Sequence, residues 1–114
     1  MKSAFKKMAH KILGFFINRV STSIALAAKN SPSVKIQQVA LFHYYQQAIR
    51  DGKRFNLDET GYRVYSQFEE DGILLYIFSA IGMGNRTFID IGAGDGINSN
   101  CANLAVNFGW KGLF

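Results

Sequence analysis

The chain has 114 residues, which is enough for one small domain with a hydrophobic core and too few for two. Its hydrophobic fraction of 48% excludes a disordered polar chain, and no apolar run approaches the roughly 18 residues that span a bilayer. One cysteine and two distant histidines exclude a disulfide framework and offer no set of metal ligands. We therefore expect no metal and a reducing, cytoplasmic setting.

The net charge of +5 is concentrated at the N-terminus. Residues 1–19 contain five Lys or Arg residues and no acidic residue, whereas the rest of the chain contains eight basic and eight acidic residues. A nucleic-acid footprint would be expected to spread along the folded domain. The charge distribution therefore predicts no nucleic-acid partner.

Residues 1–20 are predicted to form a basic amphipathic helix, within an N-terminal arm at residues 1–30. At 100° per residue, the apolar side chains fall mostly on one side and the basic ones on the other. Such a helix either packs on its own domain or lies peripherally on an anionic membrane surface, here at the inner face of the membrane. A signal peptide is a third alternative, because "SIALAAKN" offers an A-x-A-like site, although Asn18 and Arg19 interrupt the preceding apolar stretch.

Residues 31–84 are predicted to be a helical lead-in. One helix is expected to begin with Ser31 as its cap and Pro32 in its first turn. An irregular connector, "KRFNLDETGYRVY", is expected to follow. A further helix is expected from "SQFEEDGILLYIFSAIGMG", because Ser66 and Glu69 have the spacing of a capping box and acidic residues load the first turn.

Residues 85–114 are predicted to contain strand, glycine loop, helix and strand onset, an unfinished βαβ unit. The run "RTFIDIG" fits a buried parallel strand, and "INSNCANLAVNFGW" has apolar residues at helical spacings. Within that helix, Cys101 is predicted to be a small buried residue rather than a nucleophile. The segment "KGLF" is typical of the start of a second strand.

The spacing of the glycines separates three kinds of nucleotide-binding loop. A P-loop needs Lys and then Ser or Thr after its last glycine, and here Ile97 and Asn98 follow. The dinucleotide fingerprint needs a small third residue where Ile97 stands, and Asp95 adds negative charge where a pyrophosphate would lie. The remaining type is G-x-G-x-G, preceded by a strand that ends in an acidic residue. This type matches, with Asp90 two positions before Gly92.

That loop resembles motif I of class I S-adenosylmethionine-dependent methyltransferases. "YSQFEEDGIL" and "FIDIGAGDGINSNCANLAVNFGWKGLF", within residues 65–114, are similar to the opening of FkbM-like methyltransferases. The resemblance implies an α/β, Rossmann-like methyltransferase fold, truncated after the first βα unit, with an N-terminal helical lead-in. It also implies S-adenosyl-L-methionine as cofactor and methyl transfer to a hydroxyl of a sugar or small metabolite.

The resemblance further implies the cofactor-binding residues. They are Asp90, Gly92, Ala93, Gly94 and Gly96, with Asp95 and Asn98 on the edge of the loop. Gln67 and Asp71 are candidates to face the methionine end of the cofactor, although helix capping explains them without a ligand. The ribose-binding acid and the catalytic base of such enzymes are expected beyond Phe114, so no catalytic residue is assigned.

Two other functions remain open. The chain is alternatively part of an NAD-dependent oxidoreductase that uses the same turn, or a non-catalytic membrane-surface module attached through residues 1–20. If the sheet is incomplete, its strand exposes backbone groups and apolar surface. We then expect residues 1–114 to be marginally stable and to bind the cofactor weakly at best.

Overall fold

The computed structural model describes residues 2–29 and 31–114, and within the first helix it describes the side chains of residues 3–19. The chain divides into two compact units, Met1–Ser31 and Pro32–Phe114. No helix in the described part is long and apolar enough to cross a membrane. Residues 1 and 30, which bound the predicted arm, and the side chains of the A-x-A-like segment lie outside the described residues.

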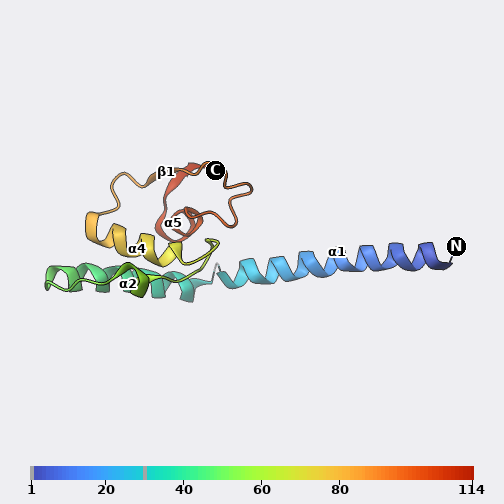
Figure 1. The fold of residues 1–114 in the computed structure, drawn as a ribbon, viewed down its shortest axis with the longest axis horizontal. Coiled ribbons are helices and arrows are strands. Elements are labelled where there is room, and N and C mark those ends of the chain that lie inside the picture. Colours follow the sequence, from blue (N-terminus) through green and yellow to red (C-terminus); the bar gives the residue numbers. More distant parts are fainter. Residues whose placement is uncertain (1, 30) are drawn as a thin grey trace. The chain divides into compact units, whose positions relative to one another are not determined.

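The first unit consists of one helix, α1 (Lys2–Lys29), which continues well beyond the helix predicted to residue 20 (Figure 1). Each described side chain of α1, from Ser3 to Arg19, is exposed. The guanidinium of Arg19 lies over the ring of Phe15, 5.7 Å from its centroid. The apolar side of α1 is therefore not buried within its own unit.

The second unit contains four helices and two short strands, and its helices α4 and α5 both pack against α2 (Figure 1). Its elements are α2 (Pro32–Arg50), α3 (Leu57–Thr60), α4 (Glu70–Ile81), β1 (Thr87–Ile89), α5 (Ala102–Phe108) and β2 (Lys111–Leu113).

The core of the second unit forms where α4, α5 and the segment just before β2 meet. It is centred on the buried side chains of Leu75, Leu104, Phe108 and Trp110. The Trp110 ring lies 4.8 Å from the ring of Phe78, centroid to centroid. Because α5 and β2 immediately follow the glycine loop, this apolar contact fixes the loop's C-terminal side on α4.

The two strands are parallel and pair in the register Thr87↔Lys111, Phe88↔Gly112 and Ile89↔Leu113. Gly112 is required by this pairing, since a Cβ there would lie 2.0 Å from the carbonyl oxygen of Phe88. The outer side chains of the pair remain in solvent, with Ile89 74% and Leu113 69% exposed.

The predicted Rossmann-like α/β fold is wrong. The described residues are mostly helical, and they contain one sheet of two three-residue strands. A Rossmann-like sheet buries its parallel strands on both faces, whereas here Phe88 is half-buried and the other strand residues are exposed. The segment "RTFIDIG" was expected to be buried strand throughout, but only its residues 87–89 are in β1.

The predicted capping box at Ser66 and Glu69 is also wrong. Helix α4 begins at Glu70, and the capping box occurs at α3 instead, where Asn56 and Glu59 bond reciprocally. The reason is that the Asp71 carboxylate, rather than the Glu69 carboxylate, accepts the hydrogen bonds of the backbone amides before α4. Its carboxylate oxygen Oδ2 accepts hydrogen bonds from the amides of Val64, Tyr65 and Ser66, at 2.6, 2.6 and 2.9 Å.

Asp71 and Gly72 together hold the connector against the first turn of α4. The side chain of Asp71 is 2% exposed, and the hydroxyl of Ser66 accepts a hydrogen bond from the Asp71 amide at 3.2 Å. The amide of Gly72 donates to the carbonyl of Tyr62 at 3.1 Å, and a Cβ at Gly72 would lie 2.2 Å from the carbonyl oxygen of Thr60. Only glycine allows the connector to cross so close to the helix.

A buried polar chain connects α2 to α5. The Gln38 side-chain oxygen accepts hydrogen bonds from the Tyr62 hydroxyl at 3.1 Å and from the Asn103 amide at 2.5 Å. The Asn103 oxygen in turn accepts from the Asn107 amide at 2.8 Å. Because its buried hydrogen bonds join the two helices directly, this chain fixes the rotation of α5 against α2.

We predict that Asp71→Ala destabilises the second unit strongly, because it leaves three amides without their acceptor. The loss is expected to be about 3 kcal/mol or more, given roughly 1–3 kcal/mol for each buried group left unsatisfied. Asp58→Ala is the matched control, since Asp58 is an exposed acid in the first turn of α3. Urea unfolding followed by circular dichroism measures both; equal losses in the two variants would contradict the role of Asp71.

Candidate functional site

Asp90 stands directly after β1, and its backbone continues the strand pairing by donating to the carbonyl of Leu113 at 2.9 Å. Its half-buried carboxylate accepts a short hydrogen bond from the hydroxyl of Ser99, across the glycine loop. The Ser99 hydroxyl also accepts a hydrogen bond from the amide of Cys101 at 2.9 Å. Asp90 therefore closes the loop between the end of β1 and the start of α5.

The three glycines of the loop all adopt positive φ, which other residues enter only with strain. The values are 82° at Gly92, 62° at Gly94 and 78° at Gly96. A Cβ at Gly96 would meet the ring of Phe114 at 3.0 Å, whereas a Cβ at Gly92 or Gly94 would point into open space. Gly96 thus serves internal packing, and the other two leave the backbone accessible from outside.

The remaining predicted residues lie around this turn in different roles. Ala93 is half-buried, and its carbonyl accepts from the Gly96 amide at 3.0 Å. Asp95 is exposed, and its carboxylate accepts from the Ile97 amide at 3.0 Å, which forms a local turn. Asn98 is exposed on the loop edge. The structure thus brings Asp90 and the glycines into one turn and leaves Asp95 and Asn98 on its outer side.

Gln67 and Asp71, both candidates to face the methionine end of the cofactor, lie in different environments. Gln67 is exposed, whereas Asp71 is buried and uses Oδ2 to hold the connector backbone. Asp71 is therefore primarily a structural residue in this fold.

Sequence reasoning missed Ser99 and placed the following helix too early. Ser99 is 3% exposed, and α5 begins at Ala102 rather than near Ile97. The sequence did contain a signal for the role of Ser99, because it stands two residues before the half-buried Cys101. Short polar side chains in such positions accept backbone hydrogen bonds at helix starts.

The environment of Cys101 makes its thiol less acidic. Burial is the main cause that raises its pKa, and the negative charge and hydrogen bonding of Asp90 raise it further. A thiol with a raised pKa is a poor nucleophile at neutral pH. The described residues also include no group of three His, Cys, Asp or Glu side chains able to hold a metal ion.

The loop combines a carboxylate with a stretch of open main chain. A carboxylate at the end of β1 favours a cation, and the open space beside Gly92 and Gly94 lets a ligand approach the main chain. The Ile97 amide, a donor that a phosphate would need, is already bonded to Asp95.

Comparison of the chain with protein-family models, with curated proteins and with solved structures found no match.

We predict that Asp90→Asn makes Cys101 more reactive, because it removes the charge that raises the thiol pKa while keeping an oxygen for Ser99. The rate of alkylation by iodoacetamide at about pH 8 should rise, since the thiolate is the reacting form. Asp95→Asn is the matched control on the outer side of the loop. Equal rates in the Asp90 and Asp95 variants would show that Asp90 does not contribute to the raised thiol pKa.

Proposed function

We propose that the loop from Asp90 to Gly96 binds S-adenosyl-L-methionine, and that the chain is the N-terminal part of an FkbM-like, S-adenosylmethionine-dependent methyltransferase. The observation that carries this proposal is the turn itself. A carboxylate at the end of β1 is followed by two positive-φ glycines whose outer side is open. Such a turn accepts a cationic, phosphate-free adenosyl compound close to its backbone.

In this proposal the acceptor is a hydroxyl of a sugar or small metabolite. The bound cofactor would supply an electrophilic methyl group. Asp90 would attract its positively charged part, while Gly92 and Gly94 would let it lie against the main chain. Positioning of this kind contributes much of the rate in group transfer, and we assign no catalytic base to the described residues.

An NAD-dependent oxidoreductase is less compatible with the same turn. Pyrophosphate binding relies on free amide donors at the start of a helix. Here the Asp95 carboxylate occupies the Ile97 amide and adds negative charge beside it. A dinucleotide would have to displace Asp95 and tolerate the charge of Asp90.

Titration of the ¹⁵N-labelled chain with S-adenosyl-L-methionine tests the proposal. We predict saturable shifts of the Gly92 and Gly94 amides at millimolar ligand, and no saturable shift with NADH. Gly92→Ala should weaken binding about tenfold or more, because a Cβ fills the space beside the backbone and strains a positive φ. Gly52→Ala is the matched control, since Gly52 has φ 84° against 82° at Gly92 and equally open surroundings.

The two glycine variants carry the same backbone strain, so a general effect on folding appears in both. Loss of binding only in Gly92→Ala supports a ligand at the loop. Binding of NADH in place of S-adenosyl-L-methionine, or equal binding by the two variants, would contradict the proposal.

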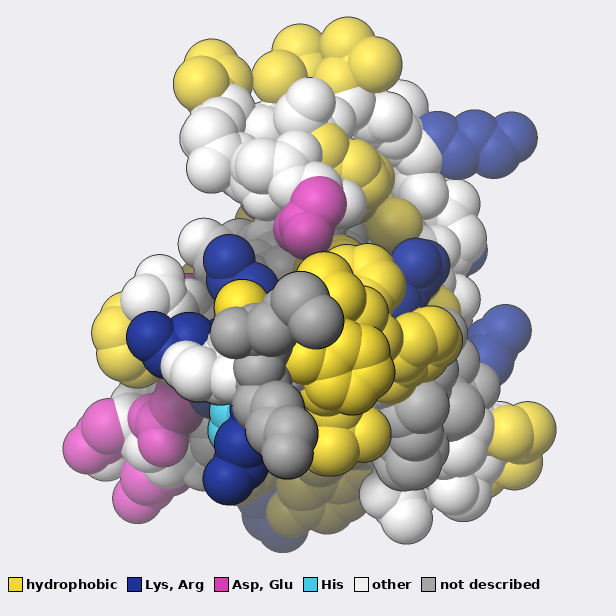
Figure 2. Space-filling model, turned by 90° about the vertical axis from the view of Figure 1, so that its right-hand side faces the viewer, with side chains coloured by type: hydrophobic (Ala, Val, Ile, Leu, Met, Phe, Trp, Pro, Cys, Tyr) yellow, Lys and Arg dark blue, Asp and Glu magenta, His cyan; other side chains and the backbone are white. Residues whose placement is uncertain are grey.

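We further propose that α1 attaches the protein peripherally to the inner face of an anionic membrane in the cytoplasm. The helix contains no acidic residue and carries Lys6, Lys7 and Lys11. Its apolar side chains are exposed, including Leu13 at 58% and Phe16 at 61%. Figure 2, which looks from the N-terminal end of α1, shows hydrophobic side chains gathered together with Lys and Arg side chains beside them. Exposed apolar surface flanked by cations is typical of helices at a lipid interface.

Co-sedimentation with vesicles tests this second proposal. We predict binding to vesicles rich in phosphatidylserine and little binding to pure phosphatidylcholine. Replacing Lys6, Lys7 and Lys11 by Gln should lower the affinity roughly a hundredfold, at about 1 kcal/mol for each basic residue near the surface. Phe16→Gln should also weaken binding, whereas Ile36→Gln, an exposed apolar position on α2, serves as the control. Equal binding to both lipids would contradict an anionic partner.

A further inference from the structure

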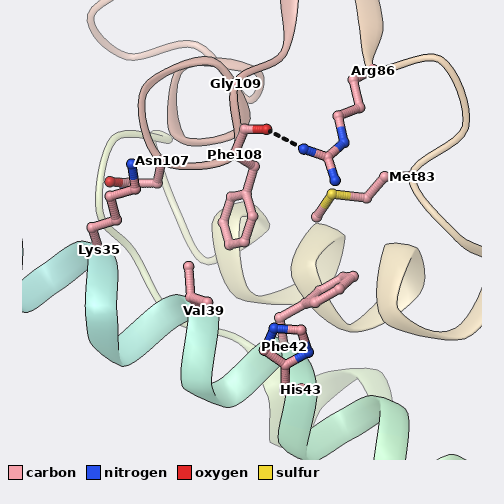
Figure 3. A pocket seen from close by; sticks show the side chains of 9 residues that line it. All are labelled: Lys35, Val39, Phe42, His43, Met83, Arg86, Asn107, Phe108 and Gly109. Atoms are coloured by element: carbon pink, nitrogen blue, oxygen red, sulfur yellow. Dashed lines mark hydrogen bonds between the residues drawn. The ribbon is translucent and has the colours of Figure 1, made fainter.

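A pocket of about 380 Å³ lies in the second unit, away from the glycine loop. It is formed by α2, the turn after α4 and the C-terminal end of α5. Its apolar surface comes from Val39, Phe42, Met83 and Phe108 (Figure 3). This volume lies within the range of roughly 300–1,000 Å³ that is usual for small-molecule sites.

The polar residues of the pocket are basic or neutral, and no acidic residue lines it. Lys35 and Arg86 stand on opposite sides of Phe108 in the view of Figure 3. His43 also lines the pocket, and its Nδ1 lies 3.2 Å from the side-chain oxygen of Gln46. The two charged side chains that line the pocket are therefore both positive, and an apolar surface lies between them.

Arg86 is held in an unusual backbone conformation at the edge of this pocket. Its φ is 57°, and it is the one non-glycine residue of the described chain with positive φ. Two backbone hydrogen bonds keep it there: its amide donates to Met83 at 3.2 Å, and its carbonyl accepts from Lys111 at 3.0 Å. Such a conformation costs about 1–3 kcal/mol, and strained residues of this kind cluster at active sites and ligand-binding segments.

The side chain of Arg86 is only partly used by the protein. One guanidinium nitrogen donates to the carbonyl of Phe108 at 3.2 Å, which fixes the group beside the apolar surface (Figure 3). A guanidinium has five N–H donors, so most of them stay available to an anion. Two parallel donors match the two oxygens of a carboxylate or related group.

We propose that this pocket binds a small organic anion with an apolar body. Arg86 holds the anionic head, Phe42, Met83 and Phe108 contact the apolar body, and Lys35 adds a second positive charge. The site shares no lining residue with the Asp90–Gly96 loop, so it does not rest on the proposed function of that loop.

Methionine methyl signals provide a local test. The chain contains three methionines, and Met83 is the one among the lining residues of the pocket. With ¹³C-methyl methionine, octanoate should shift the Met83 signal saturably. At equal concentrations, 1-octanol lacks the charge and inorganic phosphate lacks the apolar body, so both should shift Met83 much less.

Variants then separate the two parts of the site. Arg86→Gly removes the guanidinium and relieves the positive φ, so the fold is kept while octanoate affinity falls about tenfold or more. Arg50→Ala, a cation at the end of α2 outside the pocket, should bind octanoate normally. If Arg86→Gly fails to fold, Lys35→Ala with Lys53→Ala as its control replaces it, with a smaller expected loss. The absence of a saturable Met83 shift, or equal shifts with octanoate and octanol, would overturn the proposal.

Discussion

The second unit depends on one buried carboxylate. Asp71 accepts three backbone hydrogen bonds through Oδ2, and its neighbour Gly72 admits the connector to within contact of the helix. A buried charge is tolerated only when it is hydrogen-bonded in this way. Because the connector returns to α4 at this point, Tyr62 can reach Gln38 on α2. The carboxylate thereby helps to hold α2, the connector and α4 together, although these three segments are separate in the sequence.

The candidate site depends on this framework indirectly, through the packing of α5. The side chain of Leu75 on α4 packs with Leu104 and Phe108 on α5 and with Trp110 just before β2. The amide chain from Gln38 to Asn103 fixes α5 against α2. The loop between β1 and α5 is therefore held at both ends, and its open side is left for a ligand. The basic pocket uses other faces of the same elements, so one small core supports two separate binding proposals.

Local chemistry was the part of the structure that sequence could predict. Pro32 begins α2 as expected, and the glycines after Asp90 form a turn that only positive φ allows. The fold class could not be predicted in the same way, since a resemblance over residues 65–114 suggested a sheet that the described chain does not build. Asp71 was interpreted as one of the acidic residues that favour a helix start. Its burial and its three hydrogen bonds to backbone amides leave no periodic pattern in the sequence. Ser99 was missed because its partner Asp90 lies on the other side of the glycine loop. The Arg86 pocket was missed because it joins residues that are distant in sequence.

Hydrogen exchange at the amides of Tyr65 and Ser66 tests the central role of Asp71 most directly. Both residues are buried in the connector and outside any helix or strand. If the carboxylate holds them, their exchange will be as slow as that of Leu75 in the middle of α4, since all open only when the unit unfolds. Exchange at the rate of an exposed loop, with Leu75 still protected, would contradict the account.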